Sequence, residues 1–228
     1  MEEVIICRIM DGSYTATTEE GLDLEDFESQ VGLGGDSLGF WPMRSPLLIL
    51  LALGCITPAE ESEWVTIFDG KTLTGWRAAS EANWRVEDGA IVVDDGERGL
   101  LVHQDRYENY ELIVEFKAAS GTNSGVFLST KEMPAKVTED CYELNIAPPD
   151  NPFPTGSLVG RKKYGDAGEK SAWRKFEVRV EGKRVIVKLD GAEVMDYTAD
   201  KPAGGTLIGL QKNEGRVAFR NIRVRKLP

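Results

Sequence analysis

The chain has 228 residues, with 38 acidic and 27 basic side chains and a formal net charge of −11. Ten acidic and two basic residues lie in residues 1–54, so residues 55–228 carry 28 acidic and 25 basic side chains. This near balance argues against a nucleic-acid-binding protein, which would need a basic face.

Residues 1–42 hold ten acidic residues, one arginine (Arg8), repeated glycines and no clear periodicity. That composition predicts a disordered acidic leader, or a segment upstream of the true start codon. An acidic leader also has the wrong charge to precede an export signal, which favours initiation at Met43.

A lipoprotein export signal is predicted over residues 43–54. It has a short basic start, an apolar run over 47–53 and a small residue before Cys55. The run is too short to span a bilayer as a helix. Cys55 is therefore predicted to be lipidated, anchoring a periplasmic or outer-membrane lipoprotein to the membrane of a bacterial cell envelope. The alternative is that Met1 is the start and residues 47–53 form a buried strand or short helix.

Residues 55–63 are predicted to be the lipidated cysteine and a tether, and residues 64–228 one domain large enough for a proper core. Apolar residues there alternate with polar ones, and turn dipeptides such as Asp88-Gly89 and Asp190-Gly191 separate the runs. No helical periodicity is convincing. The domain is therefore predicted to be all-β, a two-sheet antiparallel sandwich or jelly roll.

Two irregularities interrupt this pattern. Residues 147–170 contain four prolines and several glycines, which predicts a long loop of the kind that is often functional. At Arg220-Asn221 the alternation changes phase, which indicates either a bulge that redirects side chains or an irregular sheet edge.

The cysteines and the histidine carry no clear chemical signal. Cys7 and Cys55 lie outside the domain, so Cys141 has no disulfide partner there and is predicted to be a buried apolar residue. His103 follows an apolar run and is predicted to be structural. One histidine and one unlipidated cysteine argue against zinc, whereas a calcium or magnesium site stays open as a cofactor.

Five ordered motifs over residues 64–227 resemble the 3-keto-disaccharide hydrolase family, once described as a domain of unknown function. The matching segments are FDGKTLTGW at 68–76, NSGVF at 123–127, YEL at 142–144, TGSL at 155–158, and IGLQ at 208–211 followed by FRNI at 219–222.

The resemblance implies a concanavalin-like jelly roll acting on glycosides that carry a ketone at C3. Because the ketone acidifies the C2 proton, a base can remove it, the C1 substituent leaves by elimination, and water adds back. A sugar 3-oxidoreductase that supplies the keto sugar is then a metabolic partner.

Glu143 is the predicted base. Glu143 and Asn145 share one face of a strand, opposite Tyr142, Leu144 and Ile146. The other predicted substrate-binding residues are Asn123, Gln211, Arg220, Arg161 and Trp173, with Tyr164 as a second stacking candidate. Structural alternatives remain: a solvated Glu143, a turn at Asn123, an ion pair at Arg220 and a core position for Trp173.

Four positions depart from the family pattern. Ser129 stands where an arginine is common, Asn145 where glutamine is, Arg174 where asparagine is, and Asn213 where a histidine is. These departures could mean a different substrate, a different mechanism or lost catalysis. We expect the cations at 161–163 to replace the missing charge.

Three functions compete at this stage. They are a 3-keto-glycoside hydrolase or lyase, a carbohydrate-binding module on the same fold, and a structural envelope protein. Fold alone does not separate them. An enzyme needs Glu143 in an enclosed cleft, whereas a binding module would favour a flat aromatic surface.

Overall fold

The computed structural model describes residues 5–10, 13–18, 63–165 and 172–228, which belong to two compact units, Met1–Ile56 and Thr57–Pro228. In the first unit, β1 (Ile5–Met10) and β2 (Ser13–Thr18) form an antiparallel hairpin with Met10 opposite Ser13. The composition of residues 1–42 did not predict this hairpin, although Asp11-Gly12 is a two-residue turn signal. The predicted export signal at 43–54, the lipidation at Cys55 and the tether lie outside the described residues.

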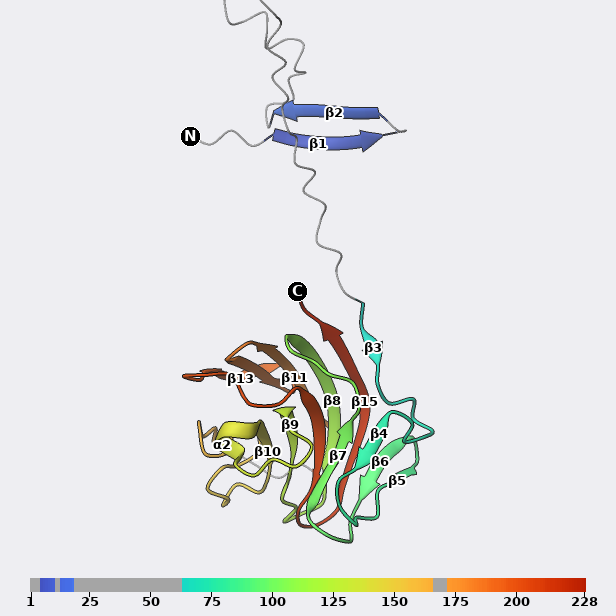
Figure 1. The fold of residues 1–228 in the computed structure, drawn as a ribbon, viewed down its shortest axis with the longest axis vertical. Helices are drawn as coiled ribbons and strands as arrows, with labels where there is room; N and C mark the ends of the chain where they lie inside the picture. Colours follow the sequence, from blue (N-terminus) through green and yellow to red (C-terminus); the bar gives the residue numbers. More distant parts are fainter. Residues whose placement is uncertain (1–4, 11–12, 19–62, 166–171) are drawn as a thin grey trace, which may run out of the picture. The chain divides into compact units, whose positions relative to one another are not determined.

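The second unit consists of two antiparallel sheets (Figure 1). The smaller has five strands in the order β10-β9-β14-β7-β4: Tyr142–Ile146, Ser124–Thr130, Leu207–Lys212, Gly99–His103 and Trp76–Ala78. The larger has the order β13-β12-β11-β8-β15-β6-β5, with β3 beside β15: Ala192–Thr198, Arg184–Leu189, Arg174–Glu181, Tyr110–Ala118, Val217–Lys226, Ala90–Val93, Arg85–Glu87 and Val65–Thr66. The predicted sandwich is confirmed.

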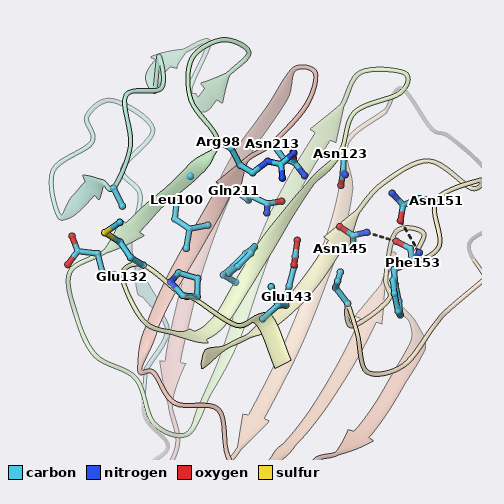
Figure 2. Close-up of a pocket in the computed structure, with 17 residues that line it drawn as sticks. Arg98, Leu100, Asn123, Glu132, Glu143, Asn145, Asn151, Phe153, Gln211 and Asn213 are labelled. Carbon is cyan, nitrogen blue, oxygen red and sulfur yellow. Dashed lines mark hydrogen bonds between the residues drawn. The ribbon is translucent and has the colours of Figure 1, made fainter. Parts of the chain in front are cut away.

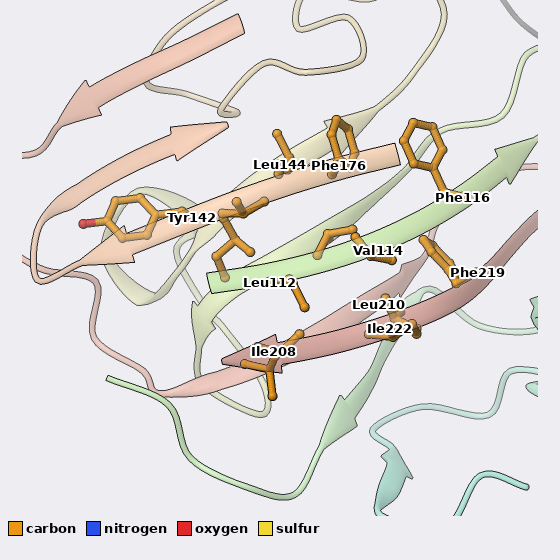
Figure 3. Packing of buried hydrophobic residues seen from close by; sticks show 14 of the residues in the cluster. Leu112, Val114, Phe116, Tyr142, Leu144, Phe176, Ile208, Leu210, Phe219 and Ile222 are labelled. Carbon is orange, nitrogen blue, oxygen red and sulfur yellow. The ribbon is translucent and has the colours of Figure 1, made fainter. Parts of the chain in front are cut away.

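Alternate residues of both sheets meet in one hydrophobic core (Figure 3). Leu112 and Val114 of β8 point into it from the larger sheet, and Leu144 of β10 points into it from the smaller one. The rings of Phe116 and Phe176 stack with centroids 4.6 Å apart. The period-two patterns read from the sequence therefore identify the inward faces correctly.

The predicted hairpins are present, and their turns use the expected residues. Asp88 and Asp190 have φ of 50° and 53°, and the glycine after each also has positive φ. Two consecutive residues with positive φ make the tight turn that joins twisted antiparallel strands. The β5–β6 and β12–β13 hairpins form in this way.

The predicted bulge in β15 is also present. The pairing of β15 with β8 shifts between Arg220 and Arg223, and Asn221 has φ of 49°. Phe219 before the bulge and Ile222 after it are both fully buried in the core. The extra residue thus explains the phase change, because it returns the apolar side chains to the inner face.

The proline-rich loop continues the smaller sheet along the edge of β10. The backbone N–H of Val159 donates to the carbonyl of Glu143, and that of Gly156 donates to the carbonyl of Asn145. The backbone N–H of Asn145 in turn donates to the carbonyl of Ser157. These bonds pair backbone N–H and C=O groups at the outer edge of β10 that would otherwise be unpaired, and they hold β10 in register.

Cys141 and His103 have the predicted structural roles. Cys141 is fully buried, and burial raises the pKa of its thiol to about 12, which makes it a poor nucleophile at neutral pH. His103 contacts the edge of the Trp76 ring, its Nδ1 lies 3.1 Å from the Tyr107 hydroxyl, and burial lowers its pKa. Among the described residues, no helix is long and apolar enough to cross a membrane.

Candidate active site

The outer face of the smaller sheet carries the polar residues that the sequence placed opposite the core. Asn145 pairs with Gly125 and Gln211 pairs with Leu100, so these four residues form one row across the strands. Glu143 lies in the next row, opposite Phe127. The predicted alternation of β10 is confirmed, since Tyr142 and Leu144 face the core instead.

These rows form the floor of a pocket of about 480 Å³ (Figure 2). The segment before α2 (Val137–Asp140) and the proline-rich loop after β10 also line this pocket. The side chains with polar groups are those of Arg98, Asn123, Glu132, Glu143, Asn145, Asn151, Gln211 and Asn213. The pocket therefore brings together four of the predicted residues: Glu143, Asn123, Asn145 and Gln211.

Glu143 stands at the centre of this pocket (Figure 2) and is 7% exposed. Burial raises the pKa of its carboxyl to about 7, against the opposing effects of a hydrogen bond from Gln211 and the charge of Arg98. Arg98 itself is 68% exposed and lies 3.9 Å from Glu214 at the pocket mouth. A carboxyl with this pKa can accept and return a proton near neutral pH.

Three amide oxygens in the pocket accept no hydrogen bond from the described part of the protein. They are Asn145 Oδ1, Gln211 Oε1 and Asn213 Oδ1, and all three are buried. Buried polar atoms are nearly always hydrogen-bonded, because an unsatisfied one costs about 1–3 kcal/mol. Their grouping in one pocket indicates a site for a ligand rich in hydroxyl donors.

Gly125 keeps the space between the acid and these amides open. A Cβ at this position would lie 3.1 Å from the Leu144 carbonyl oxygen, 3.4 Å from Glu143 Cγ and 3.6 Å from Gln211 Oε1. A methyl group would therefore crowd the backbone of β10 and fill the pocket floor. Of the NSG motif at 123–125, Asn123 lines the pocket and Gly125 lies beside Glu143.

The proline-rich loop supplies one wall, and polar contacts attach it to the sheet. Asn145 Nδ2 donates to the carbonyl oxygen of Phe153, and the backbone N–H of Phe153 donates to Asn151 Oδ1 over 2.9 Å. Figure 2 shows Asn145, Asn151 and Phe153 together on this side of Glu143. Asn145 thus has two roles, with its nitrogen holding the loop and its oxygen left for a ligand.

Two predicted binding residues lie on the other sheet. Arg220 belongs to β15 just before the bulge, where Nε donates to Glu115 over 2.7 Å and the guanidinium stacks 4.0 Å from the centroid of Trp173. Both side chains line a depression on the outer face of the larger sheet. The prediction that they share a ligand with Glu143 is corrected, because both line this separate depression and neither lines the pocket of Glu143.

Arg161 is also absent from the pocket lining. Its Nη2 donates to the Cys141 carbonyl over 2.7 Å, and its guanidinium lies 4.5 Å from the centroid of the Tyr142 ring. These contacts hold the loop against β10. Among the described lining residues the cation is Arg98, which sequence reasoning missed because no motif marks the residue before β7.

The four departures from the family pattern separate into two pairs. Asn145 and Asn213 line the pocket. Ser129 has φ of 47° and its backbone N–H donates to the buried Tyr110 hydroxyl over 3.1 Å. Arg174 is buried and its Nε donates to Asp190 over 2.9 Å. Only the first pair can change ligand recognition directly.

Within residues 63–165 and 172–228, no group of three or more His, Cys, Asp or Glu side chains is placed to hold a metal ion. Of the two carboxylates that line the described pocket, Glu132 forms an ion pair with Arg77. Glu143 is the acid in contact with the amide groups.

The fold and pocket define a jelly-roll protein with an acid-containing, amide-rich cleft, an arrangement suited to a sugar. Residues 63–225 match the family described as the 3-keto-alpha-glucoside-1,2-lyase-like domain, and the chain belongs to this family.

Several known proteins resemble this chain, and the fraction of the chain that each one covers differs. A 3-keto-disaccharide hydrolase from Bacteroides thetaiotaomicron is 35% identical over 91 residues, which are 35% of this chain and 31% of that protein, so the chain spans about a third of this relative.

Two candidate glycosyl hydrolases from Parabacteroides distasonis superpose with TM-scores of 0.64 and 0.61, at 19% and 24% identity. They cover 72% and 73% of this chain, and 94% and 100% of their own. The carbohydrate-binding module CBM66 from Bacillus subtilis has a TM-score of 0.52 at 13% identity, covering 67% of this chain and 96% of its own. At these identities the likeness shows the sandwich fold.

Proposed function

We propose that this protein cleaves the glycosidic bond of 3-keto-glycosides, with Glu143 as the general base that removes the C2 proton. The observation that carries the proposal is a buried carboxyl with a pKa of about 7 among amide oxygens that accept no hydrogen bond from the described residues. Family membership supplies the keto sugar, and the pocket supplies a base and hydroxyl acceptors for it.

The reaction balances without a redox partner. The Glu143 carboxylate takes the C2 proton, and the C–H electron pair moves toward the C3 ketone to form an enolate. Collapse of the enolate forms the C1–C2 double bond and expels the C1 oxygen with its aglycone. The proton passes from Glu143 to that oxygen, and water adding across the double bond makes the net result hydrolysis.

The enolate oxygen needs positive charge or N–H donors. Arg98, Asn123 and Asn213 lie toward one end of the pocket (Figure 2). We assign the sugar C3 oxygen to this end, with Glu143 facing C2. The guanidinium and the amide nitrogens are then the donors that stabilise the developing charge.

The site favours an enzyme over a binding module. The aromatic residues among the described lining are Phe127 and Phe153, with no tyrosine or tryptophan platform. A buried acid with a raised pKa destabilises the fold when it ionises and adds little to sugar binding by itself. Such a group is expected where proton transfer is the task.

The direct test is release of 4-nitrophenol from 4-nitrophenyl 3-keto-α-glucoside by the full chain, with divalent metal or chelator in parallel. Glu143→Gln should lower kcat about 10³-fold, because a positioned base contributes about 10²–10⁴. Glu193→Gln, an exposed acid on the larger sheet, is the matched control. Unchanged release by the Glu143 variant would remove the assignment of the base. No release by the folded wild type under any metal condition would favour a binding module.

The cell-envelope location is part of the same proposal. The signal at 43–54 and Cys55 support a lipid-anchored protein that meets keto sugars made by a separate 3-oxidoreductase. In a bacterial host, Cys55→Ala should move the protein from the membrane fraction to the soluble fraction and abolish fatty-acid labelling. Labelling that persists in the variant would exclude Cys55 as the lipid site.

A further inference from the structure

The pocket is chemically divided, and one part of it is not explained by sugar binding. We call five of its apolar lining side chains the apolar wall: Leu100, Phe127, Met133, Pro134 and Val137. Leu100 and Phe127 come from the sheet. Met133 and Pro134 precede α2 (Val137–Asp140), and Val137 is its first residue.

The apolar wall is a built feature and not an accidental exposure. Leu100 and Phe127 belong to a second hydrophobic cluster, separate from the main core, in which Val137 packs against them. Met133 lines the same pocket as Leu100, Phe127 and Val137, and it is 76% exposed. An exposed thioether beside a packed apolar surface is an adaptable contact for an apolar or aromatic ligand.

The backbone of the same segment offers few hydrogen bonds to a ligand. Pro134 has no N–H, and the N–H groups of Ala135 and Lys136 both donate to Asp140 Oδ2 over 2.9 Å. The Lys131 ammonium contacts Oδ1 of the same aspartate. Asp140 therefore fixes the segment and uses the donors that could otherwise bind a sugar hydroxyl.

We propose that the apolar wall binds the aglycone, and that the chain prefers 3-keto-glycosides with a flat apolar aglycone, such as a phenol, over 3-keto-disaccharides. The proposal rests on the proposed function, since Glu143 must face the keto sugar. A second sugar ring would place several hydroxyls against the apolar wall, where they would lose water without gaining partners.

The position of Glu143 supports this orientation. Glu143 and Phe127 are directly opposite each other on neighbouring strands, so their side chains are neighbours on the same face. A sugar that presents C2 to Glu143, with its hydroxyls toward the amides, directs its C1 substituent past Glu143 toward Phe127. The leaving group then lies where the apolar wall begins.

The experiment measures binding without turnover. In the full chain carrying Glu143→Gln, calorimetry compares 4-nitrophenyl 3-keto-α-glucoside with 3-keto-trehalose, two α-linked ligands that differ in the aglycone. We expect the aryl ligand to bind about tenfold more tightly, because it buries apolar surface against the wall. Adding Met133→Ser should weaken the aryl ligand about fivefold and leave the disaccharide unchanged.

Ala135→Ser is the matched control, because it is an exposed residue of the same segment that does not line the pocket. Its affinities for both ligands should match the parent. Equal or tighter binding of 3-keto-trehalose, or a Met133→Ser effect on both ligands alike, would overturn the aglycone assignment and leave the hydrolase proposal standing. If neither ligand binds, the proposed function fails with it.

Discussion

The outer faces of the two sheets both carry glutamate, but the partners of these glutamates differ. On the larger sheet, Glu111 lies between Arg179 and Arg225, and Glu115 pairs with Arg220. On the smaller sheet, Glu143 has a glutamine for its hydrogen-bond partner, and nearby amide oxygens have none within the part of the chain that the structure describes. Glutamates therefore lie on the outer faces of both sheets, but those of the larger sheet are paired with arginines.

The pKa values follow from this difference. Burial by itself would raise the pKa of Glu111, but hydrogen bonds from Arg225 and Arg179 lower it overall. Burial also acts on Glu143, and there it prevails over the hydrogen bond from Gln211 and the charge of Arg98. Arginine partners therefore lower the pKa of Glu111, whereas burial dominates the pKa of Glu143.

The sharpest test of the comparison is the same substitution on both faces. Burial raises the pKa of Glu143 from 4.5 to about 7, so the folded state keeps a proton that the unfolded chain has lost. The resulting stabilisation is fully present below pH 4.5 and is lost as pH rises through 7. Glu143→Gln should therefore be about 3 kcal/mol more stable than wild type at pH 8, and equal near pH 4.

Urea unfolding at the two pH values measures this difference. Glu111→Gln is the counterpart, and it should lose about 1 kcal/mol at pH 8, because Arg179 and Arg225 would lose their charged partner. Similar stability changes in both variants would mean that the two acids do not differ as described.

A second test adds a methyl group to the pocket floor and so reduces the space beside Glu143. Gly125→Ala places a methyl group 3.1 Å from the Leu144 carbonyl oxygen and beside Glu143 Cγ, so kcat/KM should fall about 10–100-fold through misplacement of the base. Gly165→Ala is the control, since a Cβ there meets nothing within 4 Å. Steady-state kinetics with the aryl substrate measure both, and full activity in the Gly125 variant would contradict the assigned floor.

A third test changes only the partner of the acid. Gln211→Ala removes a hydrogen bond that favours ionised Glu143, so the pKa of Glu143 should rise further. The ascending limb of the kcat/KM profile, expected near pH 7 in the wild type, should move to higher pH. An unchanged pH profile would mean that the ionisation that controls kcat/KM is not that of Glu143.

The smallest effect is expected on the larger sheet. Arg220→Ala removes the pair with Glu115 and the stacking on Trp173, but both contacts lie outside the pocket. We expect kcat/KM within about twofold of wild type and a stability loss of about 1 kcal/mol or less. A large loss of activity in folded Arg220→Ala would restore the original prediction for this residue.

The sequence by itself determined the inward and outward faces of the strands, the hairpins and the bulge at Asn221. It could do so because side-chain alternation and turn geometry are local properties of the backbone. For the same reason it placed Glu143 and Asn145 on one outward face. The family motifs added Asn123 and Gln211.

Only the tertiary structure decided which outward residues share a pocket. Outward-facing residues of two different sheets look alike in sequence, so Arg220 and Trp173 could not be separated from Glu143. Arg98 joins the site because β7 lies beside β14 through pairing between distant segments. The raised pKa of Glu143 has the same origin, since it depends on burial by residues that are distant in the sequence.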